Sequence, residues 1–120
     1  AFETMPSDIE DSGWEDRLRQ IIIRRRAVFE VILGSLEFII VNRWRSRFVA
    51  EAYQRILRES RQFLELALQD HIDITTRDFN TLVVLFSPAQ WRMLRKDFDL
   101  TTDEAEQWLF DTAIALYPSV

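Results

Sequence analysis

The sequence of 120 residues contains no cysteine, two glycines, three prolines and one histidine. Without cysteine, the chain can form no disulfide bond and has no thiolate metal ligand or cysteine nucleophile. Folds built from many short strands need more glycine and proline for their tight turns than this chain holds. A few long helices do not need them, so the composition favours an all-α fold.

Long apolar runs are also lacking. No stretch approaches the roughly 20 residues needed to cross a bilayer, and the longest candidate, 28–41, is interrupted by two glutamates, a glycine and a serine. The first 16 residues carry six acids and no base, whereas a secretory signal opens on basic residues. Together with the absence of cysteine, these features predict a cytoplasmic protein.

Apolar material for a core is present, because hydrophobic residues make up 48% of the chain. A length of 120 residues is typical of one domain. We expect residues 1–12 to form a flexible acidic lead and residues 13–120 to fold as a single helical domain.

The apolar residues recur at helical spacing over five stretches, two long and three short. In the first stretch, about 13–33, the recurring positions are Leu18, Ile21, Ile22, Arg25, Phe29, Ile32 and Leu33. Ser12 is suited to cap this helix, with Glu15 as its capping-box partner. The second stretch covers about 35–69.

Three shorter helices are expected over about 76–86, 87–96 and 101–116. Each opens on a residue suited to be an N-cap, namely Thr76, Ser87 and Thr101. Gln90 and Glu104 stand three residues after the second and third of these caps, the spacing of a capping box. The sequence therefore predicts a bundle of about five helices.

The link between the two long helices is the most ambiguous part of the chain. One helix over 13–69 would be about 85 Å long, which does not fit a compact domain with a radius of gyration near 14 Å. We predict a break at Gly34-Ser35, with the two long helices antiparallel around it, because glycine ends helices and serine caps them. The same dipeptide between apolar runs is also a hairpin signal, so Val28–Val41 could instead form two strands.

Pairing of long helices between chains is the alternative to a break. Many apolar residues between Ile21 and Leu68 need cover in either case. We therefore also expect a homodimer.

Candidate metal sites are weak. His71 is the only histidine, and it lies near Asp70, Asp73 and Asp78, but a histidine beside a helix start more often has a surface or capping role. Acidic and hydroxyl side chains alternate from Asp97 to Asp103, as in a calcium-binding loop. That loop would need glycine at its sixth position and glutamate at its twelfth, where Thr102 and Trp108 stand. We predict no metal and no cofactor.

Residues 86–109 resemble part of the helix-turn-helix of response-regulator DNA-binding domains. Ser87-Pro88 opens one helix, Leu94 anchors it, and Leu100 to Ala105 opens the next. A third helix with basic or polar side chains should then read the DNA groove. The chain continues instead with Asp111 to Leu116, in a region that is net acidic, so DNA binding is not inferred from the resemblance.

Catalytic groups are equally scarce, since the chain has one histidine and no glycine-rich phosphate loop. We lean against an enzyme and predict a non-catalytic module, an adaptor, regulator or assembly subunit that binds other proteins. The basic middle, residues 17–61, carries eleven arginines against four acids, a net +7. Arg43, Arg47 and Arg58 would share one face of the second long helix, and Trp44 lies among them. We predict that these four residues bind an acidic protein partner; the alternative is nucleic acid or an anionic membrane surface.

Overall fold

The computed structural model describes residues 13–118, and within that range it contains helices and no strand. The prediction of an all-α bundle with two long and three short helices is confirmed. The expected acidic lead, 1–12, lies outside the described residues. The helices are α1 (Trp14–Asn42), α2 (Arg47–Leu68), α3 (Arg77–Leu85), α4 (Pro88–Arg92) and α5 (Thr102–Leu116), and a π-helical turn, η2 (Met93–Asp97), continues α4.

Helix α1 runs through Gly34-Ser35 without interruption. The break predicted at this dipeptide is therefore wrong, and so is the alternative hairpin over Val28–Val41. A glycine inside a helix costs only about 1 kcal/mol relative to alanine. Leu33 and Leu36 on either side of it are buried, and burying each such side chain is worth about 1.5–3 kcal/mol. Packing thus outweighs the local preference to stop.

The chain breaks instead at residues 43–46. The Asn42 side chain donates to the carbonyl of Phe38 at 2.8 Å, satisfying one of the orphan acceptors at the end of α1. Ser46 has an extended backbone, and its hydroxyl accepts from the Val49 amide. An N-cap of this kind starts a new helix in a new direction. The second long helix therefore begins at Arg47, twelve residues later than the sequence suggested.

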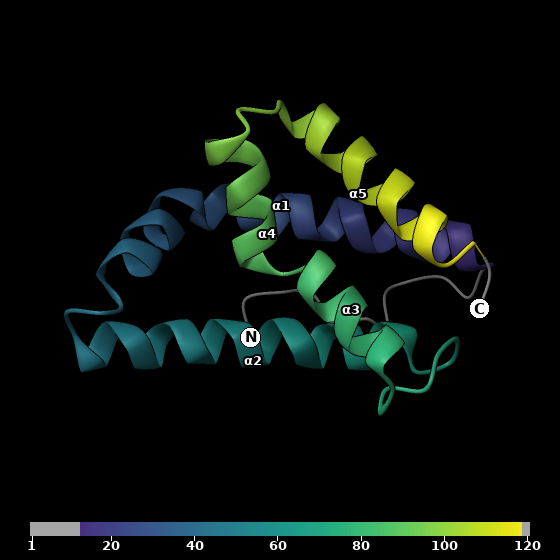
Figure 1. Cartoon of the computed structure of the whole chain (residues 1–120), viewed down its shortest axis with the longest axis horizontal. Coiled ribbons are helices and arrows are strands. Elements are labelled where there is room, and N and C mark those ends of the chain that lie inside the picture. Colours follow the sequence, from purple (N-terminus) through teal and green to yellow (C-terminus); the bar gives the residue numbers. More distant parts are fainter. Residues whose placement is uncertain (1–12, 119–120) are drawn as a thin grey trace.

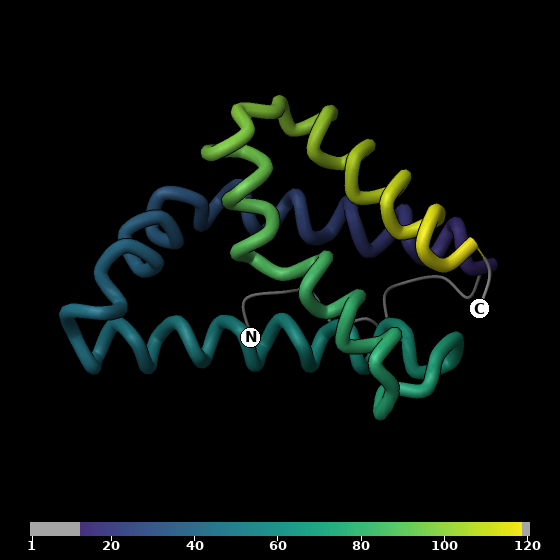
Figure 2. Tube along the Cα trace, in the orientation of Figure 1, coloured from purple at the N-terminus to yellow at the C-terminus, as the bar shows by residue number. Residues whose placement is uncertain are grey.

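The two long helices lie antiparallel, as Figures 1 and 2 show. Helix α2 and the first part of α1 lie along the long axis of a molecule measuring 42 × 28 × 26 Å, and the last turns of α1 turn from that axis toward the start of α2 (Figure 2). Helices α4 and α5 cover one side of α1, and α3 lies near the end of α2. The radius of gyration is 14.2 Å, close to the value expected for a compact domain of this length.

The core lies between the first half of α1, the second half of α2 and the three short helices. Its largest fully buried side chains include Phe29, Phe79, Phe86 and Trp91. Two arginines of α1 are also buried, and both donate to backbone carbonyls of α2. Arg17 donates to Ala67 at 2.6 Å and Arg25 donates to Ser60 at 2.7 Å. These bonds fix the spacing of the long helices at the core end.

The helix starts of the second half follow the sequence closely. Thr76, Ser87 and Thr101 each accept a hydrogen bond from the backbone amide three residues on. Thr101 and Glu104 form the complete reciprocal capping box that was predicted.

The caps of the two long helices differ from the prediction. Helix α1 begins after Gly13, which has no side chain to offer, and the predicted cap Ser12 lies outside the described residues. Helix α2 is capped by Ser46 and not by Ser35.

Candidate functional site

The most exposed aromatic side chains lie where α1 ends and α2 begins. Trp44 is 81% exposed and Phe48 is 79% exposed, and Phe38 and Val41 on the last turns of α1 are also exposed. We call these four residues the tip. Figure 1 shows that this end of the helix pair extends away from α3, α4 and α5. Such a concentration of apolar surface on a protruding corner is typical of a contact site.

The predicted Arg43, Arg47 and Arg58 do not form a single helical stripe. Arg43 lies in the break rather than on α2, and its guanidinium stacks on the rings of Trp44 and Tyr53, 4.8 Å from each ring centre. Its half-buried side chain therefore holds the two aromatic rings in place. The error comes from the misplaced helix boundary, because the angular argument assumed one helix from 43 to 58.

Arg47 and Arg58 do share a face of α2. They line a shallow hollow of about 430 Å³ on the outer side of that helix, and Arg55 lines it with them. Glu51 lies in the same hollow and pairs with Arg47 at 3.4 Å. We call this surface the arginine hollow; its charged side chains are three arginines and one glutamate. Arg55 was not singled out from the sequence, in which Glu51 and Glu59 stand four residues to either side of it.

A second recess lies on the inner side of the same arm. A groove of about 490 Å³ runs between the distal half of α1 and the first half of α2. Its walls are mainly apolar, and its lining includes Ile32, Leu36, Ile39, Ala52 and Ile56, with Arg55 and Glu59. The main hydrophobic core ends at Leu33 on α1 and begins at Phe63 on α2, so the groove lies beyond the core.

The other arginine-rich segment, 24–26, gives no comparable surface. Arg25 is completely buried, and its guanidinium faces the rings of Phe29 and Phe63 at 5.4 and 4.6 Å. Arg26 forms ion pairs with Asp103 and Glu106 of α5. Arg25 and Arg26 therefore have structural roles.

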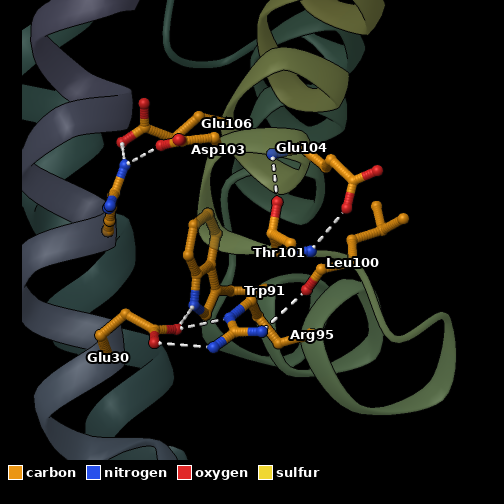
Figure 3. A network of polar contacts seen from close by, with 9 residues as sticks. Glu30, Trp91, Arg95, Leu100, Thr101, Asp103, Glu104 and Glu106 are labelled. Atoms are coloured by element: carbon orange, nitrogen blue, oxygen red, sulfur yellow. Dashed lines mark hydrogen bonds and ion pairs between the residues drawn. The ribbon is translucent and has the colours of Figure 1, made fainter.

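The acidic residues of α1 hold its other flank to α4 and η2. Glu30 accepts hydrogen bonds from Trp91 Nε1 at 2.8 Å and from Arg95 Nε and Nη2 at 2.9 and 3.1 Å (Figure 3). These bonds, Arg95 first, lower the pKa of Glu30 below its ordinary value. The hydrogen bond from Arg92 likewise lowers the pKa of Glu37. Both carboxylates are therefore ionised and structural at neutral pH.

The residues considered for metal binding have other partners. Asp73 accepts from the backbone amide and hydroxyl of Thr75, which lowers its pKa. His71 packs against Trp14, with ring centres 5.9 Å apart. Asp97 and Asp103 pair with arginines. Within residues 13–118, no three histidine or acidic side chains are grouped so as to hold a metal ion.

The sequence singled out Trp44 but missed Phe38, Phe48 and the groove. The available signal was Ser46, a good N-cap four residues after Asn42, which would have placed a corner at 43–46. A corner in the basic middle would in turn have predicted that the aromatic residues around it are exposed.

The chain matches no family model, no curated protein sequence and no solved structure. Among the described residues, no helix combines the length and apolarity required to span a membrane.

Proposed function

We propose that this chain is a non-catalytic helical module that binds another protein through the tip and the arginine hollow. The observation that carries the proposal is the exposure of Trp44 and Phe48 beside Arg47, Arg55 and Arg58. Tryptophan, tyrosine and arginine dominate the residues that contribute most to protein association. Here Trp44 and the three arginines of the hollow are exposed at one end of the helix pair.

The chemistry of the surface specifies the partner. At 100° per residue, Phe48 and Arg55 are about 20° apart around α2, so an apolar and a cationic contact lie along one line. A partner with an apolar side chain flanked by carboxylates matches this pattern. Each exposed ion pair adds only about 0–1 kcal/mol, so the aromatic contacts supply most of the affinity and the arginines select for an acidic partner.

The proposal is tested by photo-crosslinking from position 48 in nuclease-treated extract of the source cells. Trp44→Ala and the triple variant R47Q/R55Q/R58Q should each lose the crosslinked protein. Arg77→Gln on α3 and Phe98→Ala after η2 remove an exposed arginine and an exposed aromatic elsewhere, and both should retain it. If the two tip and hollow variants capture the same protein as the wild type, this surface is only solvated.

An anionic surface is the second candidate ligand. Arginine and tryptophan together at a protruding corner are also the residues that bind phosphate headgroups and phosphate backbones. Flotation with phosphatidylserine vesicles and titration with single-stranded DNA distinguish these ligands from a protein. Binding to phosphates should fall steeply as salt is raised, whereas contact centred on Trp44 and Phe48 should fall only slightly.

A further inference from the structure

Helix α1 is apolar on its outer side as well as on its core side. Five uncharged positions follow one another at spacings of four, three, four and three residues, namely Ala27, Val31, Gly34, Phe38 and Val41. At 100° per residue they lie within an arc of about 80°. All five are exposed, with Val31 at 85%, Phe38 at 60% and Val41 at 57%. We call this line the outer stripe.

The other faces of α1 are already in use. Leu18, Phe29 and Leu36 are buried in the core, and Glu30 and Glu37 on one flank bind Arg95 and Arg92. On the opposite flank, Ile32 and Ile39 face the groove toward α2. The outer stripe is the apolar face of α1 that remains exposed, and a continuous row of exposed apolar side chains is typical of an interaction surface.

The spacing of the stripe identifies what kind of partner fits. Apolar residues at alternating four and three positions form the seam of a two-stranded coiled coil. Small residues alternate with larger ones along it, so that Val31 and Phe38 can act as knobs and Ala27 and Gly34 leave room for holes. A β-carbon added at Gly34 would meet no atom within 4 Å, so the space above this residue is open. A helix with the same alternation is complementary to it.

We propose that α1 pairs with α1 of a second copy along the outer stripe, with Gly34 near the closest approach, and that the protein is a homodimer. A two-fold interface places one surface patch against an identical patch, and this patch is complementary to itself in shape.

Charge also favours a second copy at this surface. The five residues of the stripe are uncharged, and the nearby carboxylates of Glu30 and Glu37 are neutralised by arginines of their own chain. Two stripes therefore meet without repulsion. Two arginine hollows would repel each other, so the hollow does not serve as the self-contact. The dimer interface shares Phe38 and Val41 with the tip but includes neither Trp44, Phe48 nor the arginine hollow. Variants at Trp44 and in the hollow therefore test the partner site without altering the seam.

The seam is short. From Ala27 to Val41 it extends about 21 Å, at 1.5 Å per residue, which is two heptads. Interfaces that bury less than about 1,200 Å² in total belong to the weak, reversible class. We therefore expect a dimer that forms at high micromolar concentration and dissociates on dilution.

Sedimentation equilibrium of the full chain tests the proposal. At high micromolar concentration the wild type should show twice the monomer mass of 14.3 kDa. V31E/F38E should remain monomeric at the same concentration, because a symmetric seam would bring its carboxylates together. Val84→Glu is the matched control, since Val84 is 64% exposed on α3, and it should leave the dimer intact. Far-UV circular dichroism verifies that each variant remains helical.

A charge-swapped pair makes the test specific. V31K/F38K alone should also be monomeric, but mixed with V31E/F38E it should restore the dimer mass, because opposite charges then face each other across the seam. A monomeric wild type would overturn the proposal, and so would a V31E/F38E variant that still dimerises. Failure of the mixture to associate while both variants are folded would likewise count against the stripe as the seam.

Discussion

Glu30 joins α1 to α4 and η2. Its carboxylate accepts three hydrogen bonds from Trp91 and Arg95, and Arg95 in turn donates to the carbonyl of Leu100 at 2.7 Å (Figure 3). One side chain thereby fixes α4, η2 and the segment before α5 against α1. Hydrogen bonds to a charged group contribute about 1.5–3 kcal/mol when partly buried, so this network is a major tertiary contact.

Glu30→Gln should destabilise the fold by about 1–3 kcal/mol at pH 7, because an amide of the same shape cannot accept from Arg95 through both of its polar atoms. Chemical denaturation measures the loss. Glu51→Gln is the control, since Glu51 forms only an exposed pair with Arg47, and its effect should be near zero. Equal stability of the wild type and Glu30→Gln would show that the network adds nothing.

The same contribution depends on pH. The pKa of Glu30 is lowered in the folded state, so its stabilisation is complete above the unfolded-state pKa of about 4.3. It is lost as the pH falls through the lower folded-state value. The stability difference between wild type and Glu30→Gln should therefore be constant from pH 7 to pH 5 and shrink below pH 4. A difference that persists undiminished in acid would mean that a shape effect, and not the charge, is responsible.

Sequence spacing predicted which face of a helix a residue occupies, but it could not predict the residue's partners from distant parts of the chain. Arg25 recurs at the spacing of the core positions of α1, which correctly indicated its inward face. The sequence could not show that its guanidinium reaches the carbonyl of Ser60, because that acceptor is 35 residues away and belongs to the backbone. Because every residue has a backbone carbonyl, the sequence does not indicate which one accepts such a hydrogen bond.

At the scale of the element, the question is why α1 continues where a break was predicted. Thr76, Ser87 and Thr101 mark real helix starts because an N-cap acts over three residues, and the sequence shows all of them. Gly34-Ser35 has the same local appearance, but burial of Leu33 and Leu36 in the core decides its conformation. The tip was missed for the same reason, because its location depends on where α1 ends.

Gly34→Ala should stabilise the monomer by about 0.5–1 kcal/mol, because alanine has the higher helix propensity and loses less backbone entropy on folding. No atom lies within 4 Å of the added β-carbon, so no clash offsets the gain. The measurement is best made in the monomeric V31E/F38E background, by chemical denaturation with and without Gly34→Ala. A loss of stability there would mean that the backbone at this residue is not helical in solution.

A bulkier side chain at Gly34 should weaken the dimer. If helices approach closely at Gly34, bulk at this position separates them, so Gly34→Leu should raise the dissociation constant of the dimer while α1 remains helical. Ser35→Leu is a suitable control, since Ser35 is exposed but lies about 100° from Gly34. Equal dimer affinity for Gly34→Leu and the wild type, measured by sedimentation, would place the closest approach elsewhere.

At the scale of the whole molecule, the arginines of the basic middle fall into two groups. One group binds within the fold, to carbonyls of α2 or to carboxylates of α5, and consists of Arg17, Arg25 and Arg26. The other group lies on the outer face of α2 and consists of Arg47, Arg55 and Arg58. The sequence shows the net charge of the segment but not this division, because both groups have similar neighbours in the chain. Only the packing of α1 against α2 separates structural arginines from those available to a partner.

Self-association couples to the stability of the whole domain, which gives a last prediction. A ligand that binds only the folded state raises the melting temperature with its concentration, and in a homodimer the second copy is that ligand. The wild-type Tm should therefore rise as protein concentration rises from low to high micromolar, and that of V31E/F38E should not. Scanning calorimetry with concentration as the variable measures both. At the lowest concentration the two Tm values should differ only slightly, because surface substitutions usually change stability by no more than about 0.5 kcal/mol each. A wild-type Tm that does not change with concentration would mean that the outer stripe stays exposed in the folded protein, and that its regular spacing does not lead to pairing.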